Sequence, residues 1–64
     1  MKISVIGYGN LGRSLISGLL RSGAAPQDLC VCDASLAALS EAESLGVQTT
    51  SNPAAAAEHG EVVF

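Results

Sequence analysis

The start of the chain, where an apolar run leads into three spaced glycines, most constrains its fold. Residues 3–6 read Ile-Ser-Val-Ile, and Gly7, Gly9 and Gly12 follow in the spacing Gly-x-Gly-x-x-Gly. A helical pattern of apolar residues begins at once. In this context the first glycine allows a tight turn, the second lets a pyrophosphate approach the backbone, and the third lets the helix pack close to the strand. The pattern predicts a dinucleotide-binding turn that faces the N-terminal end of the helix.

Beyond this turn, short apolar runs alternate with helical patterns along the whole sequence. Gly23, Gly46 and Gly60 are placed to end three helices. Strands separated by helices pair in parallel through right-handed crossovers. The β-α-β-α-β-α-β order therefore predicts an α/β fold, the N-terminal part of a Rossmann-type, doubly wound parallel sheet. The patterns predict strands over residues 2–6, 29–32, 47–50 and from 61, and helices over 10–22, 36–45 and 53–59.

The length of 64 residues limits the chain to one small domain. A complete dinucleotide-binding domain has six strands, whereas this chain has room for about four. The sequence also stops within the apolar run Val62-Val63-Phe64. We therefore expect residues 1–64 to form a partial dinucleotide-binding domain, the N-terminal portion of a longer protein.

Charge and apolar patterning argue against several classes of protein. The net charge is −3 and there is no basic patch, so a nucleic-acid partner is not expected. No apolar stretch approaches the roughly 20 residues of a membrane span, and Gly7 interrupts the first apolar run too early for a signal peptide. We expect a cytoplasmic protein. Cys30 and Cys32 lack the spacing and the companion ligands of a metal site, so we expect them to be buried strand residues.

Asp33 is the main candidate site residue outside the glycine motif. It follows the second predicted strand, 21 residues after Gly12. An acidic side chain at this place hydrogen-bonds the adenosine ribose hydroxyls and repels a 2′-phosphate. No arginine or lysine is expected near it to neutralise that charge, so the residues favour NAD over NADP. The alternative is that Asp33 sits in a solvated loop and caps the second helix, for which Ser35 is also a plausible N-cap.

Four further positions each carry an expectation. Tyr8, between two glycines, should point outward near the cofactor. Asn52 precedes the third helix and either caps it or contacts a ligand at the carboxyl edge of the sheet. Gly18 interrupts the first helix, and close packing would explain it. His59, the only histidine, is expected to interact with a helix C-terminus or to face water.

The sequence resembles the N-terminus of the pyrroline-5-carboxylate reductase family over all 64 residues. Residues 6–12 match a family motif of the form Gly-x-Gly-Asn-Met, and residues 15–23 match its first helix with an internal glycine. Tyr8 departs from the small residue that is usual there. Two further segments carry the resemblance, namely 46–52 and 61–64.

The resemblance implies hydride transfer from a reduced nicotinamide to the C=N bond of 1-pyrroline-5-carboxylate, a small-molecule substrate, giving L-proline. It implies that the pyrophosphate lies on residues 6–11 and that Ala34 and Asn52 lie on the adenosine side. The family suggests NADPH whereas Asp33 favours NADH, so both NADP and NAD stay open. The expected cofactor-binding residues are Ile6, Gly7, Tyr8, Gly9, Asn10, Leu11, Gly12, Asp33, Ala34 and Asn52.

In the family, the substrate contacts and the dimer come from a C-terminal helical domain, which this sequence lacks. No catalytic residue is therefore assigned. The resemblance implies that the full-length protein is a homo-oligomer and that the 64-residue chain alone is inactive.

Two other readings of the same sequence stay open. The first is another NAD(P)-dependent dehydrogenase with a similar start: prephenate dehydrogenase, a deazaflavin-dependent NADP reductase, or a 6-phosphogluconate or hydroxyisobutyrate dehydrogenase. Gly9-Asn10 and the helix containing Gly18 favour the pyrroline-5-carboxylate enzyme over these. The second is a nucleotide-sensing regulatory module without catalytic activity, because fold alone does not fix function.

Overall fold

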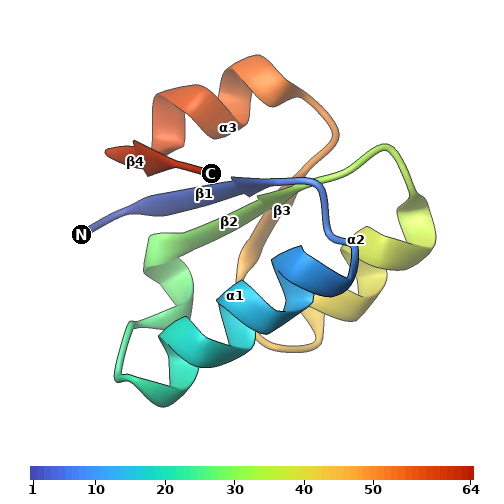
Figure 1. Ribbon diagram of the computed structural model, residues 1–64. Helices are drawn as coiled ribbons and strands as arrows, with labels where there is room; N and C mark the ends of the chain where they lie inside the picture. The colour runs from blue at the N-terminus through green and yellow to red at the C-terminus, as the bar shows by residue number, and fades with distance from the viewer.

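A computed structural model describes residues 1–64 of the chain. Strands and helices alternate along it (Figure 1). The strands are β1 (Ile3–Ile6), β2 (Leu29–Cys32), β3 (Gln48–Thr50) and β4 (Val62–Val63). The helices are α1 (Asn10–Arg21), α2 (Leu36–Glu43) and α3 (Pro53–His59), with a 3-10 turn, η1 (Pro26–Asp28), before β2. The predicted order of elements is confirmed.

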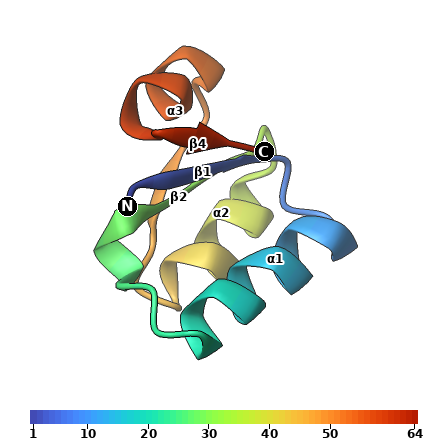
Figure 2. The ribbon, with the colours of Figure 1, turned by 60° about the vertical axis from the view of Figure 1, so that its left-hand side comes forward.

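The four strands form one parallel sheet in the order β3-β2-β1-β4. Ile3 of β1 pairs with Leu29 of β2 on one side and with Val62 of β4 on the other. The helices α1 and α2 cover one face of the sheet and α3 covers the other (Figures 1 and 2). The strand order thus reverses at β1, and ligands of such sheets bind beyond the carboxyl ends of the strands at this point. The Rossmann-type prediction is confirmed.

The core divides into two clusters because side chains alternate between the faces of a strand. The cluster under α3 consists of Cys30, Cys32 and Ala56. Both cysteines are buried and free, as predicted, and burial raises the pKa of the Cys30 thiol. The larger cluster under α1 and α2 consists of Val5, Tyr8, Ile16, Leu29, Val31, Leu39, Ala42 and Val47.

Ser4 is a fully buried polar side chain that ties α3 to the centre of the sheet. Its hydroxyl donates to the carbonyl of Ala56 at 2.6 Å and lies 3.2 Å from Nδ1 of His59. The histidine ring therefore turns toward β1, and its Nε2 is buried without a hydrogen-bond partner. His59 lies in the last turn of α3, at the helix C-terminus as expected. The alternative in which its ring faces water is wrong, because the short α3 packs its last turn onto Ser4.

Element boundaries differ from the predicted ones by one or two residues. The observed bounds of β2 and α3 are the predicted ones, residues 29–32 and 53–59. Helix α2 ends at Glu43 instead of Leu45, and β4 begins at Val62 instead of residue 61. The 3-10 turn at Pro26 was not predicted. These differences lie at element ends, where hydrogen bonding from neighbouring segments decides the last residue.

No helix has the length and apolar character needed to cross a membrane. No three His, Cys, Asp or Glu side chains gather where they could hold a metal ion.

Candidate cofactor-binding site

The glycine-rich turn joins the carboxyl end of β1 to the first turn of α1. Gly7 has a φ of 95°, in the left-handed region that glycine adopts without strain. Its N–H donates to the carbonyl of Cys32 at 2.7 Å, which fixes the turn against the end of β2. The turn is therefore held by main-chain contacts at the reversal point of the sheet.

Gly12 and Gly9 differ in what surrounds them. A Cβ on Gly12 would clash with the Gly7 carbonyl oxygen and lie 3.5 Å from Cγ1 of Val5 in β1, so the predicted close packing of the helix on the strand is confirmed. A Cβ on Gly9 would have no atom within 4 Å, which leaves open space beside the backbone there. A Cβ on Gly18 would also meet nothing within 4 Å, so the expectation of close packing at Gly18 is wrong.

Gly9 is the N-cap residue of α1, and no side chain caps this helix end. The first amides of a helix have no partners within it, and together with the helix dipole they attract anions. The open space at Gly9 therefore adjoins a helix end suited to a phosphate group.

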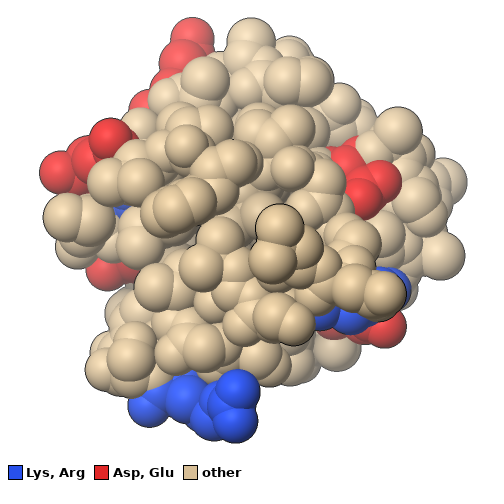
Figure 3. Space-filling model, in the orientation of Figure 1, with Lys and Arg blue, Asp and Glu red and all other residues tan.

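A cavity of about 550 Å³ lies beside this turn and is lined mainly by apolar residues, including Leu15 and Phe64. Its size is in the range of roughly 300–1,000 Å³ that is typical of small-molecule sites. The face seen in Figure 3 is mostly uncharged, with acidic and basic groups near its edges. Six predicted cofactor-binding residues line the cavity: Ile6, Gly7, Gly9, Asn10, Leu11 and Gly12.

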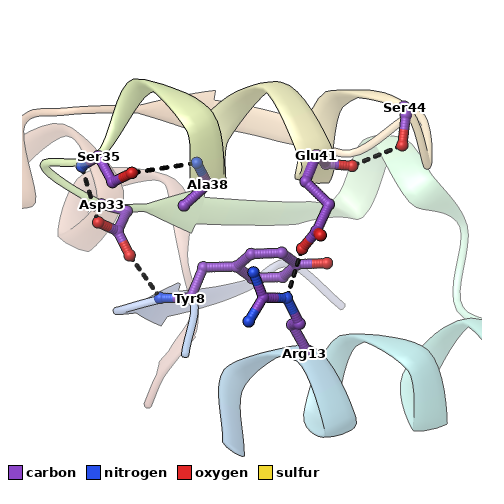
Figure 4. Close-up of polar contacts among 7 residues, drawn as sticks. All are labelled: Tyr8, Arg13, Asp33, Ser35, Ala38, Glu41 and Ser44. Atoms are coloured by element: carbon purple, nitrogen blue, oxygen red, sulfur yellow. Dashed lines mark hydrogen bonds and ion pairs between the residues drawn. The ribbon is translucent and has the colours of Figure 1, made fainter. Parts of the chain in front are cut away.

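Tyr8 points inward, so the expectation that it faces outward near the cofactor is wrong. Its side chain belongs to the core cluster under α1 and α2, and the residue is only 4% exposed. Arg13 covers the ring, with its guanidinium carbon 5.3 Å from the ring centroid (Figure 4). Burial is the main cause that raises the pKa of Tyr8. The turn directs this residue between the helices, where burial of the aromatic ring is favourable.

Asp33 connects the glycine-rich turn to the loop after β2. One carboxylate oxygen accepts from the N–H of Tyr8 and the other from the N–H of Ser35, both at 2.8 Å (Figure 4). These amides, that of Ser35 first, lower the pKa of Asp33. The cap of α2 is Ser35, whose hydroxyl accepts from the N–H of Ala38 at 3.2 Å. The alternative in which Asp33 caps α2 is therefore wrong.

Asp33 is within reach of one positive charge, that of Arg13, although no basic residue lies next to it in the sequence. Arg13 belongs to the first turn of α1, and its charge contributes to lowering the pKa of Asp33. Its guanidinium also donates to the carboxylate of Glu41 in α2 (Figure 4). The sequence next to Asp33 gives no sign of this charge, because Arg13 is 20 positions away and is brought toward the end of β2 by helix α1.

Asn52 and Ala34 lie outside the cavity, in the segments that follow β3 and β2. Both are exposed. The Asn52 side chain accepts from the N–H of Ala54 at 2.9 Å, so its predicted capping role is confirmed. The site thus has a compact part on the glycine-rich turn and an open part along the carboxyl edge.

A sequence model of the family described as "NADP oxidoreductase coenzyme F420-dependent" matches residues 2–64. The chain belongs to this family. The family covers pyrroline-5-carboxylate reductases. No curated protein matches the chain significantly.

Membership of the F420-dependent NADP oxidoreductase family agrees with the fold and with the glycine-rich turn. The chain is an NAD(P)-binding oxidoreductase domain of the Rossmann-like type. In such a domain the pyrophosphate lies on the turn and the adenosine ribose near the end of β2. The cavity lies beside the glycine-rich turn, and Asp33 directly follows β2.

We expect the substitution Asp33→Asn to destabilise the protein at neutral pH and to have less effect in acid. The folded-state pKa of Asp33 lies below its unfolded value of about 3.9. Its contribution to the free energy of unfolding is therefore present above the unfolded pKa and lost as the pH falls through the folded pKa. Urea unfolding of both proteins between neutral pH and about pH 2 measures this. A difference in stability that is the same at every pH would contradict the expectation.

Proposed function

We propose that this chain is the cofactor-binding part of a pyrroline-5-carboxylate reductase. In this reaction the reduced nicotinamide transfers a hydride to the imine carbon of 1-pyrroline-5-carboxylate and the nitrogen takes up a proton, giving L-proline and oxidised cofactor. The observation that carries the dinucleotide-binding part of the proposal is the open backbone at Gly9 beside the uncapped end of α1, at the point where the strand order reverses. The family match supports an NADP-binding oxidoreductase. The choice of this substrate rests on the resemblance of residues 6–12 and 15–23 to the pyrroline-5-carboxylate reductase family.

The proposed cofactor spans the two parts of the site. The pyrophosphate lies on the turn, where the backbone of residues 7–12 approaches it and the amides of α1 donate to its oxygens. The adenosine side extends along the carboxyl edge toward Asp33, Ala34 and Asn52. The cofactor is NADP or NAD.

Residues 1–64 account for only part of the proposed enzyme. Four strands are present, whereas a complete dinucleotide-binding domain has six. We propose that residues 1–64 form a partial cofactor domain, and that the substrate contacts and the oligomer contacts belong to further parts of the protein. The 64-residue chain alone should therefore transfer no hydride, and oxidation of NADPH by the isolated chain in the presence of substrate would contradict this.

A second candidate reaction comes from the description of the family, which names coenzyme F420. In that reaction hydride passes between this deazaflavin and NADP. The two candidates share the dinucleotide site and differ only in the second substrate. The experiment must therefore vary that substrate while the nicotinamide cofactor is kept the same.

The test begins with titration of the full-length protein with NADPH and NADH, followed by fluorescence of the reduced nicotinamide. We expect saturable binding. NADPH or NADH oxidation is then measured with 1-pyrroline-5-carboxylate and separately with oxidised F420. Oxidation dependent on 1-pyrroline-5-carboxylate supports the proposal, and oxidation dependent only on F420 supports the second candidate. Binding without turnover of either compound would indicate a nucleotide-sensing module, and absence of binding would overturn all three.

A further inference from the structure

Arg13 and Glu41 form an ion pair above the buried Tyr8 ring (Figure 4). Arg13 comes from α1 and Glu41 from α2, so the pair bridges the two helices on this face of the sheet. Their side chains are 45% and 50% exposed. An ion pair this exposed adds little to stability, because water and salt screen it and two long side chains lose freedom. The Arg13 guanidinium is therefore available to an external anion at a small energetic cost.

The same tyrosine places this guanidinium relative to the end of β2. The Tyr8 N–H is held by Asp33, while the Tyr8 ring lies under Arg13. In this fold the adenosine ribose lies beside the acidic residue at the end of the second strand. Asp33 already accepts hydrogen bonds at both carboxylate oxygens, so it acts there as a fixed negative charge. A 2′-phosphate on that ribose needs a cation nearby to offset this charge.

Arg13 is the basic residue that the fold brings to this edge. The chain has three lysine and arginine residues. Lys2 precedes β1, at the amino end of the sheet, and Arg21 ends α1 one helix length away from the turn. An arginine guanidinium matches phosphate geometry with two parallel hydrogen bonds and also stacks on an aromatic ring. Arg13 already lies over the Tyr8 ring, which offers it a flat surface for such a contact.

We propose that Arg13 binds the 2′-phosphate of NADPH, and that Glu41 weakens this contact by competing for the same guanidinium. This inference rests on the proposed dinucleotide-binding function. With NADH, which has no 2′-phosphate, Arg13 stays paired with Glu41. With NADPH, the guanidinium moves over the Tyr8 ring from Glu41 toward the ribose. The choice of cofactor is thus a competition between one carboxylate of the protein and one phosphate of the ligand.

The test compares the dissociation constants of NADPH and NADH for three variants of the full-length protein. Arg13→Gln should weaken NADPH binding by about 10-fold to 100-fold, the loss expected for a hydrogen bond to a charged group, and leave NADH binding unchanged. Glu41→Gln should tighten NADPH binding by about threefold to fivefold, because the competing ion pair is lost. Arg21→Gln is the matched control in the same helix, and it should leave both constants unchanged.

The outcomes separate this inference from the function on which it rests. If the wild-type protein binds neither dinucleotide, the proposed function fails, and the inference fails with it. If the wild-type protein binds both but Arg13→Gln changes the two constants equally or not at all, only the inference is overturned. The variant Arg13→Lys distinguishes loss of the positive charge from loss of packing on the Tyr8 ring. A lysine keeps the charge, so this variant should retain part of the preference for NADPH that Arg13→Gln loses, and an equal loss in both variants would also overturn the inference.

Discussion

The substitution Gly12→Ala should lower the free energy of unfolding by about 1–3 kcal/mol, the range for overpacking a close contact. The new Cβ would lie 2.4 Å from the carbonyl oxygen of Gly7 and 3.3 Å from its carbon. Both are backbone atoms, so no flexible side chain can move aside. The helix must instead shift away from the turn, which disturbs the packing of Ile16 against the sheet. Urea unfolding of the wild-type and variant proteins measures the loss.

Gly18→Ala is the matched control for this prediction, because it makes the same chemical change in the same helix. A Cβ at Gly18 meets no atom within 4 Å. Alanine favours the helix over glycine by about 1 kcal/mol, so this variant should be more stable than the wild-type protein. Equal effects of the two substitutions would show that the close contact at Gly12 does not limit the fold.

The substitution Gly9→Val should weaken dinucleotide binding by about 100-fold while the protein stays folded. The backbone at Gly9 is extended, with φ −83° and ψ −162°, and the space around its Cβ position is empty, so the fold accepts a branched side chain. That side chain would occupy the space through which a pyrophosphate approaches α1. Loss of one or two hydrogen bonds from backbone amides to the charged phosphates, at about 1.5–3 kcal/mol each, accounts for a factor of this size.

NADPH titration of the Gly9→Val protein gives its affinity for the cofactor, and urea unfolding of the same preparation gives its free energy of unfolding. The free energy of unfolding should change by no more than about 1 kcal/mol, since only the residue at a helix N-cap is altered. Gly9→Ala should fall between the wild-type protein and the valine variant in affinity. Unchanged affinity in the valine variant would place the pyrophosphate elsewhere and would contradict the proposed site.

Local sequence signals were sufficient for most of the fold. The Gly-x-Gly-x-x-Gly spacing predicted both the turn at Gly7 and the close helix contact at Gly12, because each depends on the lack of a side chain at one residue. Proline at the start of α3 and the capping side chain of Asn52 defined that helix. The alternation of strands and helices was enough to predict a parallel Rossmann-type sheet, since such elements have few ways to bury their apolar faces.

Contacts between segments distant in the sequence decided the rest. Tyr8 turned inward because the space between α1 and α2 accepts its ring, and no residue next to it in the chain reveals that space. Arg13 lies near Asp33 because a helix and a strand bring together residues that are 20 positions apart. The close packing expected at Gly18 is absent, because the sheet covers another face of α1. The sequence by itself determined the turn and the topology, while the tertiary structure decided which charges surround the end of β2.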